Sequence, residues 1–182
     1  MGKGGSGKST ATLCCLNSPL LDAADDYGLV SSDPQPYFHS LYNSGKVNLH
    51  DMERFRWLGG AGHCGVLDSH KALYFLHRLF PEKISAGFPL RAIVLPRVSG
   101  TAESRITPAS RAQAMLALAP STLFQLPGAE AQKFAHLSAL VKALPAYVLE
   151  SGTDWAQIPR ALAELVNTLN ASAGHSVNPS KE

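Results

Sequence analysis

The sequence predicts a single α/β domain in which helices flank a mixed β-sheet. Its 182 residues, of which 45% are hydrophobic, suit one globular unit with a substantial core. Short runs of branched apolar residues indicate strands, and apolar residues spaced by three and four positions indicate helices. A glycine-rich motif at the start of the chain opens the first of these helices. Together these three features place the chain in the α/β class.

The opening motif matches the phosphate-loop pattern G-x-x-x-x-G-K-[ST] from Gly2 to Ser9. Glycines let the backbone pass close to phosphate oxygens, and the following helix adds the positive end of its dipole. Lys8 is expected to reach the outer phosphates of a nucleotide, and the Ser9 hydroxyl to hold Mg²⁺. A flexible linker is the alternative, which the consecutive Gly7, Lys8 and Ser9 disfavour. The expected phosphate-binding residues are Gly4, Gly5, Ser6, Gly7, Lys8, Ser9 and Thr10.

The position of the motif is unusual, because a phosphate loop normally follows a buried β-strand and only Met1 precedes it here. Either the chain is truncated, which we favour, or another element supplies this wall of the site. In other proteins with this motif, the preceding strand orients the phosphate loop. The expectation of activity therefore depends on whether this strand, or another element in its place, forms the wall of the site.

Composition and charge exclude several classes of protein. The net charge of +2 does not by itself indicate nucleic-acid or membrane binding. No stretch approaches the roughly 20 apolar residues of a membrane span, and no secretory signal is present. The three cysteines, Cys14, Cys15 and Cys64, lack metal-ligand spacing and favour a reducing, cytoplasmic location.

The first quarter of the chain predicts one helix and two short strands. The helix covers residues 9–16, and the proline at position 19 helps to end it. Residues 20–24 form an apolar run that suits a buried strand, and residues 28–30 suit a second one. Residues 31–36 contain two prolines and an aspartate, which predicts a turn.

The middle of the chain gives weaker patterns, and residues 37–46 are left unassigned. Residues 49–57 suit a short helix, whereas residues 72–79 fit a strand or a helix. Residues 90–95 predict the strongest later strand because they are rich in branched side chains. Pro96 is expected to close it.

Two helices are predicted next. Thr107 is the expected cap of a helix that has Pro108 at its first position and continues to about Ala117. Residues 130–144 place apolar side chains at three- and four-residue steps, which predicts an amphipathic helix.

The last part of the chain predicts a short strand over residues 147–149 and a helix over residues 158–169. No repeat or linker divides the sequence. We therefore expect one nucleotide-binding domain over residues 1–171 and a disordered polar tail over residues 172–182.

Two adjacent acids, Asp25 and Asp26, follow the predicted strand and lie 17 residues after Lys8. That interval fits a helix, a turn and a strand that returns beside the phosphate loop. One carboxylate would then coordinate Mg²⁺ alongside Ser9, and the other would accept the proton of an attacking hydroxyl. Both can serve only where the strand has ended, since consecutive strand residues face opposite sides. The alternative is a pair of solvated acids at a turn.

These two motifs together resemble the HPr serine kinase-like family, which pairs its phosphate loop with a following strand end of the form DDY. The resemblance rests on residues 4–10 and 21–30. Weaker likenesses to uncharacterised bacterial kinase-like relatives occur at residues 40–46, 120–128 and 144–149. The likeness extends to about residue 166.

The resemblance implies a fold similar to the nucleotide-binding half of phosphoenolpyruvate carboxykinase. It also implies an ATP- and Mg²⁺-dependent kinase that phosphorylates a serine hydroxyl of a protein or peptide. Lys8 and Ser9 would take the triphosphate and metal roles, and Asp25 and Asp26 the base and metal roles, in an order that the sequence does not decide. The glycine-containing signature that follows the aspartates in true HPr kinase/phosphorylases is missing, so HPr and the phosphorylase activity are not carried over.

Two further basic residues are candidates for the same chemistry. Arg105 follows the strongest predicted strand, and from such a loop an arginine stabilises the charge of a transferring phosphoryl group. Pairing with Glu103 is the alternative. Lys46 is a candidate contact for phosphate or substrate, with a surface position as the alternative.

Two rival functions remain open. Lys3 also fits the signature lysine of partition-type ATPases, although the 17-residue interval between Lys8 and Asp25 speaks against them. The second rival is a non-catalytic role, in which the chain is a folded remnant that binds nucleotide weakly. For the kinase, the expected partner is a protein or peptide with an acceptor serine, with no nucleic acid and no membrane, and self-association is left open.

Overall fold

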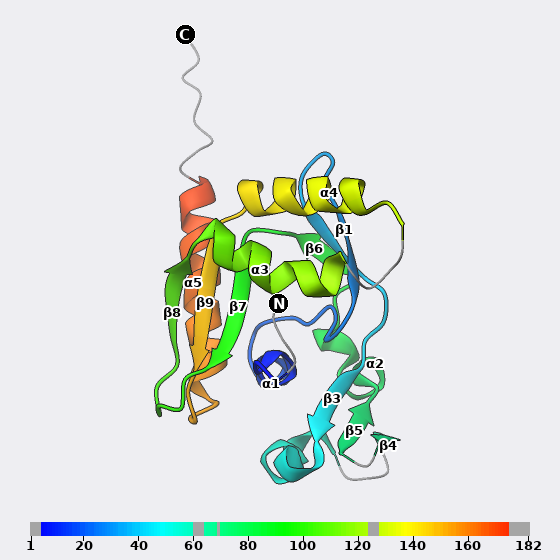
Figure 1. Ribbon diagram of the computed structural model, residues 1–182. Helices are drawn as coiled ribbons and strands as arrows, with labels where there is room; N and C mark the ends of the chain where they lie inside the picture. The colour runs from blue at the N-terminus through cyan, green and yellow to red at the C-terminus, as the bar shows by residue number, and fades with distance from the viewer. Residues whose placement is uncertain (1–4, 60–63, 69, 124–127, 175–182) are drawn as a thin grey trace.

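The computed structural model describes residues 5–59, 64–68, 70–123 and 128–174, with no side-chain detail for 64–68 and 173–174. Within these residues the fold is mixed α/β, with three three-stranded sheets arranged around a central helix, α1 (Lys8–Leu16) (Figure 1). The α/β class predicted from the sequence is therefore confirmed.

The first sheet has the strand order β7-β9-β8 and is the mixed one. Strand β7 (Ile93–Val98) runs parallel to β9 (Ala146–Ser151), and β8 (Arg105–Ala109) runs antiparallel to β9. Helices α3 (Arg111–Thr122) and α4 (Glu130–Ala143) pack with the buried Ile93 and Leu95 on one face.

The opposite face of this sheet is covered by α1 and by α5 (Gln157–Gly174). There Ala11, Leu149 and Ile158 form a small buried cluster with Val94. Val94 contacts this cluster, whereas its neighbours Ile93 and Leu95 contact the cluster on the opposite face, because successive side chains of a strand point to opposite faces. The first half of β7 is therefore covered on both faces, which explains its run of branched residues, whereas its C-terminal end is exposed.

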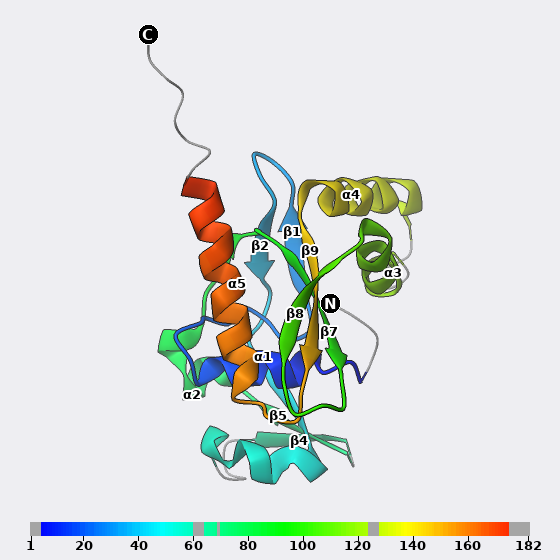
Figure 2. The ribbon, with the colours of Figure 1, turned by 90° about the vertical axis from the view of Figure 1, so that its left-hand side faces the viewer.

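The second sheet, β3-β5-β4, lies on the other side of α1 (Figure 2). Strand β3 (Gly45–Asn48) pairs antiparallel with β5 (Lys71–Tyr74), which pairs with β4 (Cys64–Asp68). The 3₁₀ helix η1 (Leu49–Leu58) follows β3 directly. Leu13 and Leu16 of α1 join a buried cluster that also contains Val47, Phe55, Leu58, Ala72, Tyr74 and Leu76. Helix α1 thus connects the cores of both sheets.

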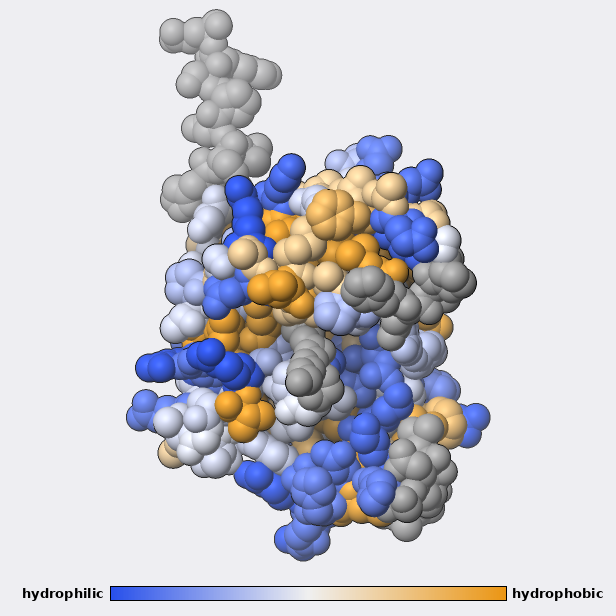
Figure 3. All heavy atoms as spheres, viewed as in Figure 1, coloured by the Kyte–Doolittle hydropathy of each residue, from blue (hydrophilic) through white to orange (hydrophobic). Residues whose placement is uncertain are grey.

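The third sheet, β1-β2-β6, is antiparallel and lies to one side of this arrangement. Its strands are β1 (Gly28–Ser31), β2 (Tyr37–Ser40) and β6 (Gly87–Pro89). The connection to β6 contains α2 (Leu76–Leu79) and the short 3₁₀ helix η3 (Pro81–Lys83). In Figure 3, hydrophobic side chains gather on the surface over α3 and α4, whereas hydrophilic side chains dominate the face below.

The predicted strand over residues 20–24 is wrong. Only Asp22 makes a β-bridge, to Ile84, with backbone hydrogen bonds from Asp22 N–H to Lys83 and from Ser85 N–H to Asp22. The helical turn η3 ends immediately before Ile84, so the partner segment is extended for too short a distance to continue the ladder.

The end of β7 and the start of the helix after β8 also differ from the predicted boundaries, because β7 and β8 are edge strands within the described residues. Strand β7 continues through Pro96, and β8 contains Thr107 and Pro108, which were expected to begin a helix. Proline is tolerated on an edge because its missing N–H costs no ladder hydrogen bond on the open side. The next helix begins instead after Ser110, which forms a capping box with Gln113.

The remaining predicted elements are confirmed in outline: the first helix, the strand near residue 29, the turn after it, the helix near residue 50, and the last three elements. Residues 72–79 contain both a strand and a helical turn, and the unassigned residues 37–46 contribute β2 and the start of β3.

Helix α5 continues to Gly174, so residues 172–174 are not a disordered tail, and 175–182 lie outside the described residues. No helix in the described ranges combines the length and apolarity needed to cross a membrane.

Candidate functional site

The phosphate-loop motif forms a tight turn at the N-terminus of α1. Gly5 and Gly7 have φ values of 78° and 91°, which glycine adopts without strain. A Cβ atom on Gly7 would lie 3.6 Å from Val98, whereas one on Gly5 would meet nothing within 4 Å. The need for glycine is therefore conformational. Lys3 and Gly4 lie outside the described residues.

This turn lines a cavity of about 360 Å³, which we call the phosphate-loop cavity. Gly5 and the segment from Gly7 to Thr10 form one wall, and the C-terminal ends of β7 and β9 form another. Open α/β sheets place ligands at the C-terminal ends of parallel strands. The loop and these strand ends therefore define the same ligand-binding edge.

The phosphate-loop cavity is positively charged. Its lining residues include the cations Lys8, Lys46, Arg54 and Lys71 and the carboxylate of Asp51. Converging cations beside a helix N-terminus attract a polyphosphate more strongly than any neutral ligand of the same size.

Asp25 does not line this cavity, but its side chain forms a hydrogen bond with Ser9 of the phosphate loop. Its Oδ2 atom accepts a 3.2 Å hydrogen bond from the backbone N–H of Lys46, and its buried Oδ1 atom has no hydrogen-bond partner among the described residues. Burial raises the pKa of Asp25, and a hydrogen bond with the Ser9 side chain opposes this. Ser9 is therefore brought together with Asp25, one of the two acids that the sequence offered as its metal-binding partner.

Asp26 has a different environment. Its carboxylate forms an ion pair with the Lys46 ammonium, and this hydrogen bond raises the pKa of Lys46. The backbone bends at residues 25 and 26, and the strand predicted before them is not formed. The alternation of a strand, which would have sent the two side chains to opposite faces, therefore does not apply to them.

A third acid, Asp22, was not singled out from the sequence. It is 7% exposed, and burial first and the charge of Asp25 second raise its pKa to about 6. Its Oδ2 atom has no hydrogen-bond partner among the described residues. The sequence feature that could have identified Asp22 is its position as an acid inside the otherwise apolar run of residues 20–24.

The residues beside the loop fit a magnesium ion. The Ser9 hydroxyl and the Asp25 carboxylate are the hard oxygen ligands that Mg²⁺ prefers, and Asp25 Oδ1 is buried without a partner. No group of three or more His, Cys, Asp or Glu side chains suited to a metal occurs in the described ranges.

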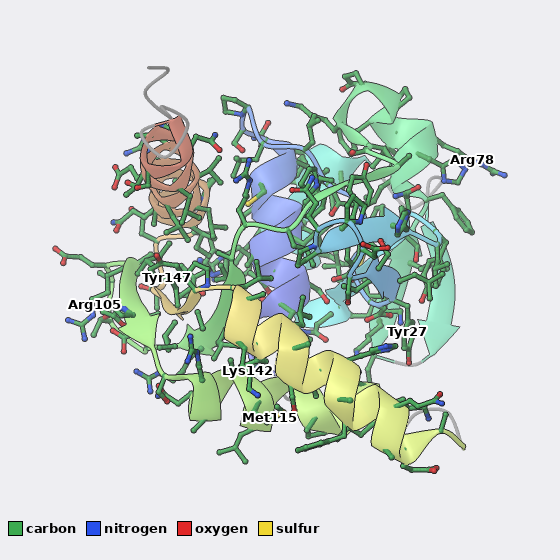
Figure 4. The ribbon with its side chains drawn as sticks, turned by 90° about the horizontal axis from the view of Figure 1, so that it is seen from above. Tyr27, Arg78, Arg105, Met115, Lys142 and Tyr147 are labelled. Atoms are coloured by element: carbon green, nitrogen blue, oxygen red, sulfur yellow. The ribbon has the colours of Figure 1, made fainter. Side chains whose placement is uncertain are left out.

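Arg105 does not join this site. It begins β8, where its side chain forms an ion pair with Glu150, which Arg97 also contacts. Arg105 is absent from the lining of the phosphate-loop cavity, and in Figure 4 it lies on the opposite side of α1 from Tyr27. The ion-pair partner of Arg105 is therefore Glu150, and not Glu103, which the sequence offered as the alternative to a role at the site. The two arginines lower the pKa of Glu150.

Sequence reasoning missed Arg54, which extends from η1 to the end of β9. Its Nη2 atom donates a 2.8 Å hydrogen bond to the Thr153 carbonyl, and its guanidinium lies 3.5 Å from the centroid of the Trp155 ring. Residues 54 and 153 are far apart in the sequence, so no local pattern could have connected them.

Searches against protein-family models, curated proteins and solved structures found no match to this chain. The resemblance to the HPr serine kinase-like family therefore rests on the motif residues themselves, and what it implies about function is a proposal.

Proposed function

We propose that this protein is an ATP- and Mg²⁺-dependent kinase that transfers the γ-phosphoryl group to a serine hydroxyl of a protein or peptide. The proposal also includes the P-loop fold related to phosphoenolpyruvate carboxykinase that the resemblance implies. The observation that carries it is Asp25, which forms a side-chain hydrogen bond with Ser9 of the phosphate loop and has one buried oxygen atom without a hydrogen-bond partner among the described residues. A structural carboxylate would normally have both oxygens paired.

The roles divide along the geometry of the cavity. Lys8 and the loop N–H groups bind the outer phosphates, and Lys46, Arg54 and Lys71 add positive charge around them. Ser9 and Asp25 would hold Mg²⁺, which would supply neutralisation of phosphate charge when bound. Arg105 is left out of this scheme because Glu150 binds its side chain.

Asp26 is the better candidate for the general base. It is the more exposed of the two acids, and its ion pair with Lys46 holds it at the rim of the site. The exposed rings of Tyr27 and Tyr42 lie with their centroids 6.4 Å apart, and the charge of Asp26 contributes to a raised pKa of Tyr42, whose main cause is desolvation. An open surface beside the base suits an acceptor that is part of a polypeptide.

The test is to incubate the chain with Mg²⁺, γ-labelled ATP and serine-containing peptides encoded beside its gene, then to locate the label. We expect a phosphoserine product, and none with Lys8→Ala, which should weaken Mg·ATP binding roughly 10- to 100-fold by removing a charge-assisted contact. Lys142→Ala, on the distant helix α4, is the matched control. A calorimetric titration with Mg·ATP that registers no binding would overturn the proposal.

A further inference from the structure

The β1-β2-β6 sheet has two outer strands, and their free edges differ. Strand β2 lies in the middle, so β1 and β6 each have one side without a strand partner among the described residues. Unpaired N–H and C=O groups on such an edge are a template for another extended chain, and proteins usually block them. Which groups point outward follows from the register of the strands.

Two hydrogen bonds at the ends of the β2–β6 ladder fix this register. The Ser40 N–H donates to the Ala86 carbonyl at 2.9 Å, and the Leu90 N–H donates to the Pro36 carbonyl at 2.8 Å. In an antiparallel pair, residues that bond directly to the partner strand alternate with residues whose backbone groups point away from it. Even-numbered residues of β2 therefore bond to β6, and odd-numbered residues bond to β1.

The outer edge of β6 is blocked. Its outward residues are Gly87 and Pro89, because they lie opposite odd-numbered residues of β2. The Ser85 hydroxyl donates a 2.8 Å hydrogen bond to the Gly87 carbonyl and accepts one of 3.3 Å from the Gly87 N–H. Pro89 has no N–H. No outward N–H of this strand is therefore left for another chain.

The outer edge of β1 is open. Its outward residues are Gly28 and Val30, because Leu29 and Ser31 lie opposite the odd-numbered residues of β2 and bond to them. No backbone hydrogen bond joins Gly28 or Val30 to any further segment among the described residues. Leu29 and Val30 are 59% and 42% exposed, on opposite faces of the strand. Two residues, each with a donor and an acceptor, are therefore available to a fourth strand.

The sheet beside this edge is apolar and uncharged. Its strands have the sequences GLVS, YFHS and GFP, which contain no Asp, Glu, Lys or Arg. The Phe38 and Phe88 rings stack with centroids 5.4 Å apart, and the Phe38 ring covers Gly28, where a Cβ atom would overlap it. An uncharged strand matches this surface in charge, and its apolar side chains at alternate positions would pack on these rings.

The open edge begins two residues after Asp26, the proposed general base. At about 3.3 Å per residue, an extended chain covers the interval from Gly28 to Asp26 in about two residues. Asp26 forms an ion pair with Lys46, which lines the phosphate-loop cavity. A chain bound along β1 therefore leads to the base and to the mouth of that cavity.

We propose that the acceptor polypeptide binds as an extended fourth strand on the outer edge of β1, with its serine beside Asp26. This inference rests on the proposed function. Backbone hydrogen bonds to Gly28 and Val30 supply affinity, and the apolar sheet selects uncharged side chains. In the transfer, the serine oxygen bonds to the γ-phosphorus as the bond from that phosphorus to the β,γ-bridging oxygen breaks. ADP leaves, and Asp26 accepts the hydroxyl proton.

The experiment measures transfer from γ-labelled Mg·ATP to two synthetic peptides with blocked ends, Val-Thr-Val-Thr-Gly-Ser and Ser-Gly-Thr-Val-Thr-Val. They carry an uncharged strand-forming segment before or after the serine, which covers both directions of pairing. Val30→Pro removes one outward N–H and retains the hydrogen bonds to β2 that Leu29 and Ser31 make. We expect it to raise the peptide KM roughly 5- to 50-fold, because a peptide carbonyl loses its partner, and to leave Mg·ATP affinity unchanged. Val30→Thr, which keeps the N–H, should raise the KM far less.

A change confined to the peptide gives a second test that leaves the protein unaltered. Methylation of the backbone nitrogens at alternate positions of the strand-forming segment should raise the KM where those N–H groups face β1. Methylation at the positions between them should have little effect, because these N–H groups point away from β1. Such an alternation distinguishes strand pairing from a contact made by side chains alone.

Four outcomes separate the strand site from the proposed function. An unchanged KM for Val30→Pro, or equal sensitivity to methylation at every position, would overturn the strand site while transfer itself persisted. Transfer to peptides encoded beside the gene but to neither synthetic peptide would also overturn it, because backbone pairing tolerates different side chains. A dimer that Val30→Pro dissociates in analytical ultracentrifugation would assign the edge to a second copy of the chain instead. Failure of Mg·ATP to bind would refute the proposed function.

Discussion

Asp22 has the least favourable environment of the three acids near the phosphate loop. It is almost fully buried, one of its oxygens has no partner among the described residues, and Asp25 adds a second negative charge nearby. Its pKa of about 6, against an ordinary value of 3.8, means that the folded protein binds the proton more tightly than the unfolded chain. Stability therefore falls as the pH rises from about 4 to about 6.

Asp22→Asn removes this charge and tests the argument. We expect the variant to be more stable than the natural chain at pH 7 by about 3 kcal/mol, and the difference to vanish only below about pH 3, where Asp22 is protonated in both the folded and the unfolded state. Urea unfolding between pH 3 and 8 measures it, with Glu82→Gln on the surface as the control. A variant that is less stable than the natural chain at pH 7 would contradict the burial argument.

Asp25 and Asp26 differ in what their loss should do. Asp25→Asn and Asp26→Asn should each keep nucleotide affinity within about tenfold, yet lower phosphoryl transfer by roughly 10²-fold or more, the usual contribution of a positioned acid–base group. Asp25→Asn should also raise the Mg²⁺ concentration required for half-maximal rate, whereas Asp26→Asn should not. Single-turnover transfer at several Mg²⁺ concentrations separates the two roles, and wild-type rates in both variants would refute them.

At the scale of elements, the start of α3 shows how tertiary pairing displaced a local signal. Thr107 and Pro108 have the residue types of a helix start, but β9 captures them as strand β8. Ser110 then offers an equivalent cap three residues later, and its hydroxyl accepts a 3.2 Å hydrogen bond from the Gln113 N–H. The helix therefore begins at the first cap beyond the strand.

Ser110→Ala tests this boundary because it removes the side-chain half of the capping box. We expect a loss of stability of about 1 kcal/mol, and recovery of most of it by Ser110→Asp, since aspartate caps equally well. Thermal unfolding followed by circular dichroism is the measurement. If alanine and aspartate at this position proved equally stable, the cap would not be what fixes the start of α3.

At the scale of the whole molecule, the phosphate-loop cavity is assembled from segments that are distant in the sequence. The loop, β3 with η1, and the end of β9 each contribute part of its lining. Arg54 joins two of these segments through Thr153. A ligand that binds all three can do so only in the folded state, so binding and global stability are linked.

Saturating nucleotide should therefore stabilise the whole fold. At about 100 times its Kd, Mg·ATP should add about 2.7 kcal/mol, which corresponds to a rise in Tm of roughly 5–10 °C for a chain of this size. Differential scanning fluorimetry is the measurement. Lys8→Ala should lose most of the shift, and an equal shift in that variant would place the ligand elsewhere.

The sequence by itself determined the α/β class, most of the helices, the glycine turn and the acid pair, because these depend on local conformational preference and on spacing along the chain. Residues 130–144 are an example, since an apolar period of 3.6 has one physical solution. Tertiary structure decided what the strands pair with and what the charged groups face. It turned Thr107 and Pro108 into a strand, attached Arg105 to Glu150, buried Asp22, and brought Arg54 to Trp155. Pairing and burial join residues far apart in the chain, and no local pattern contains that information.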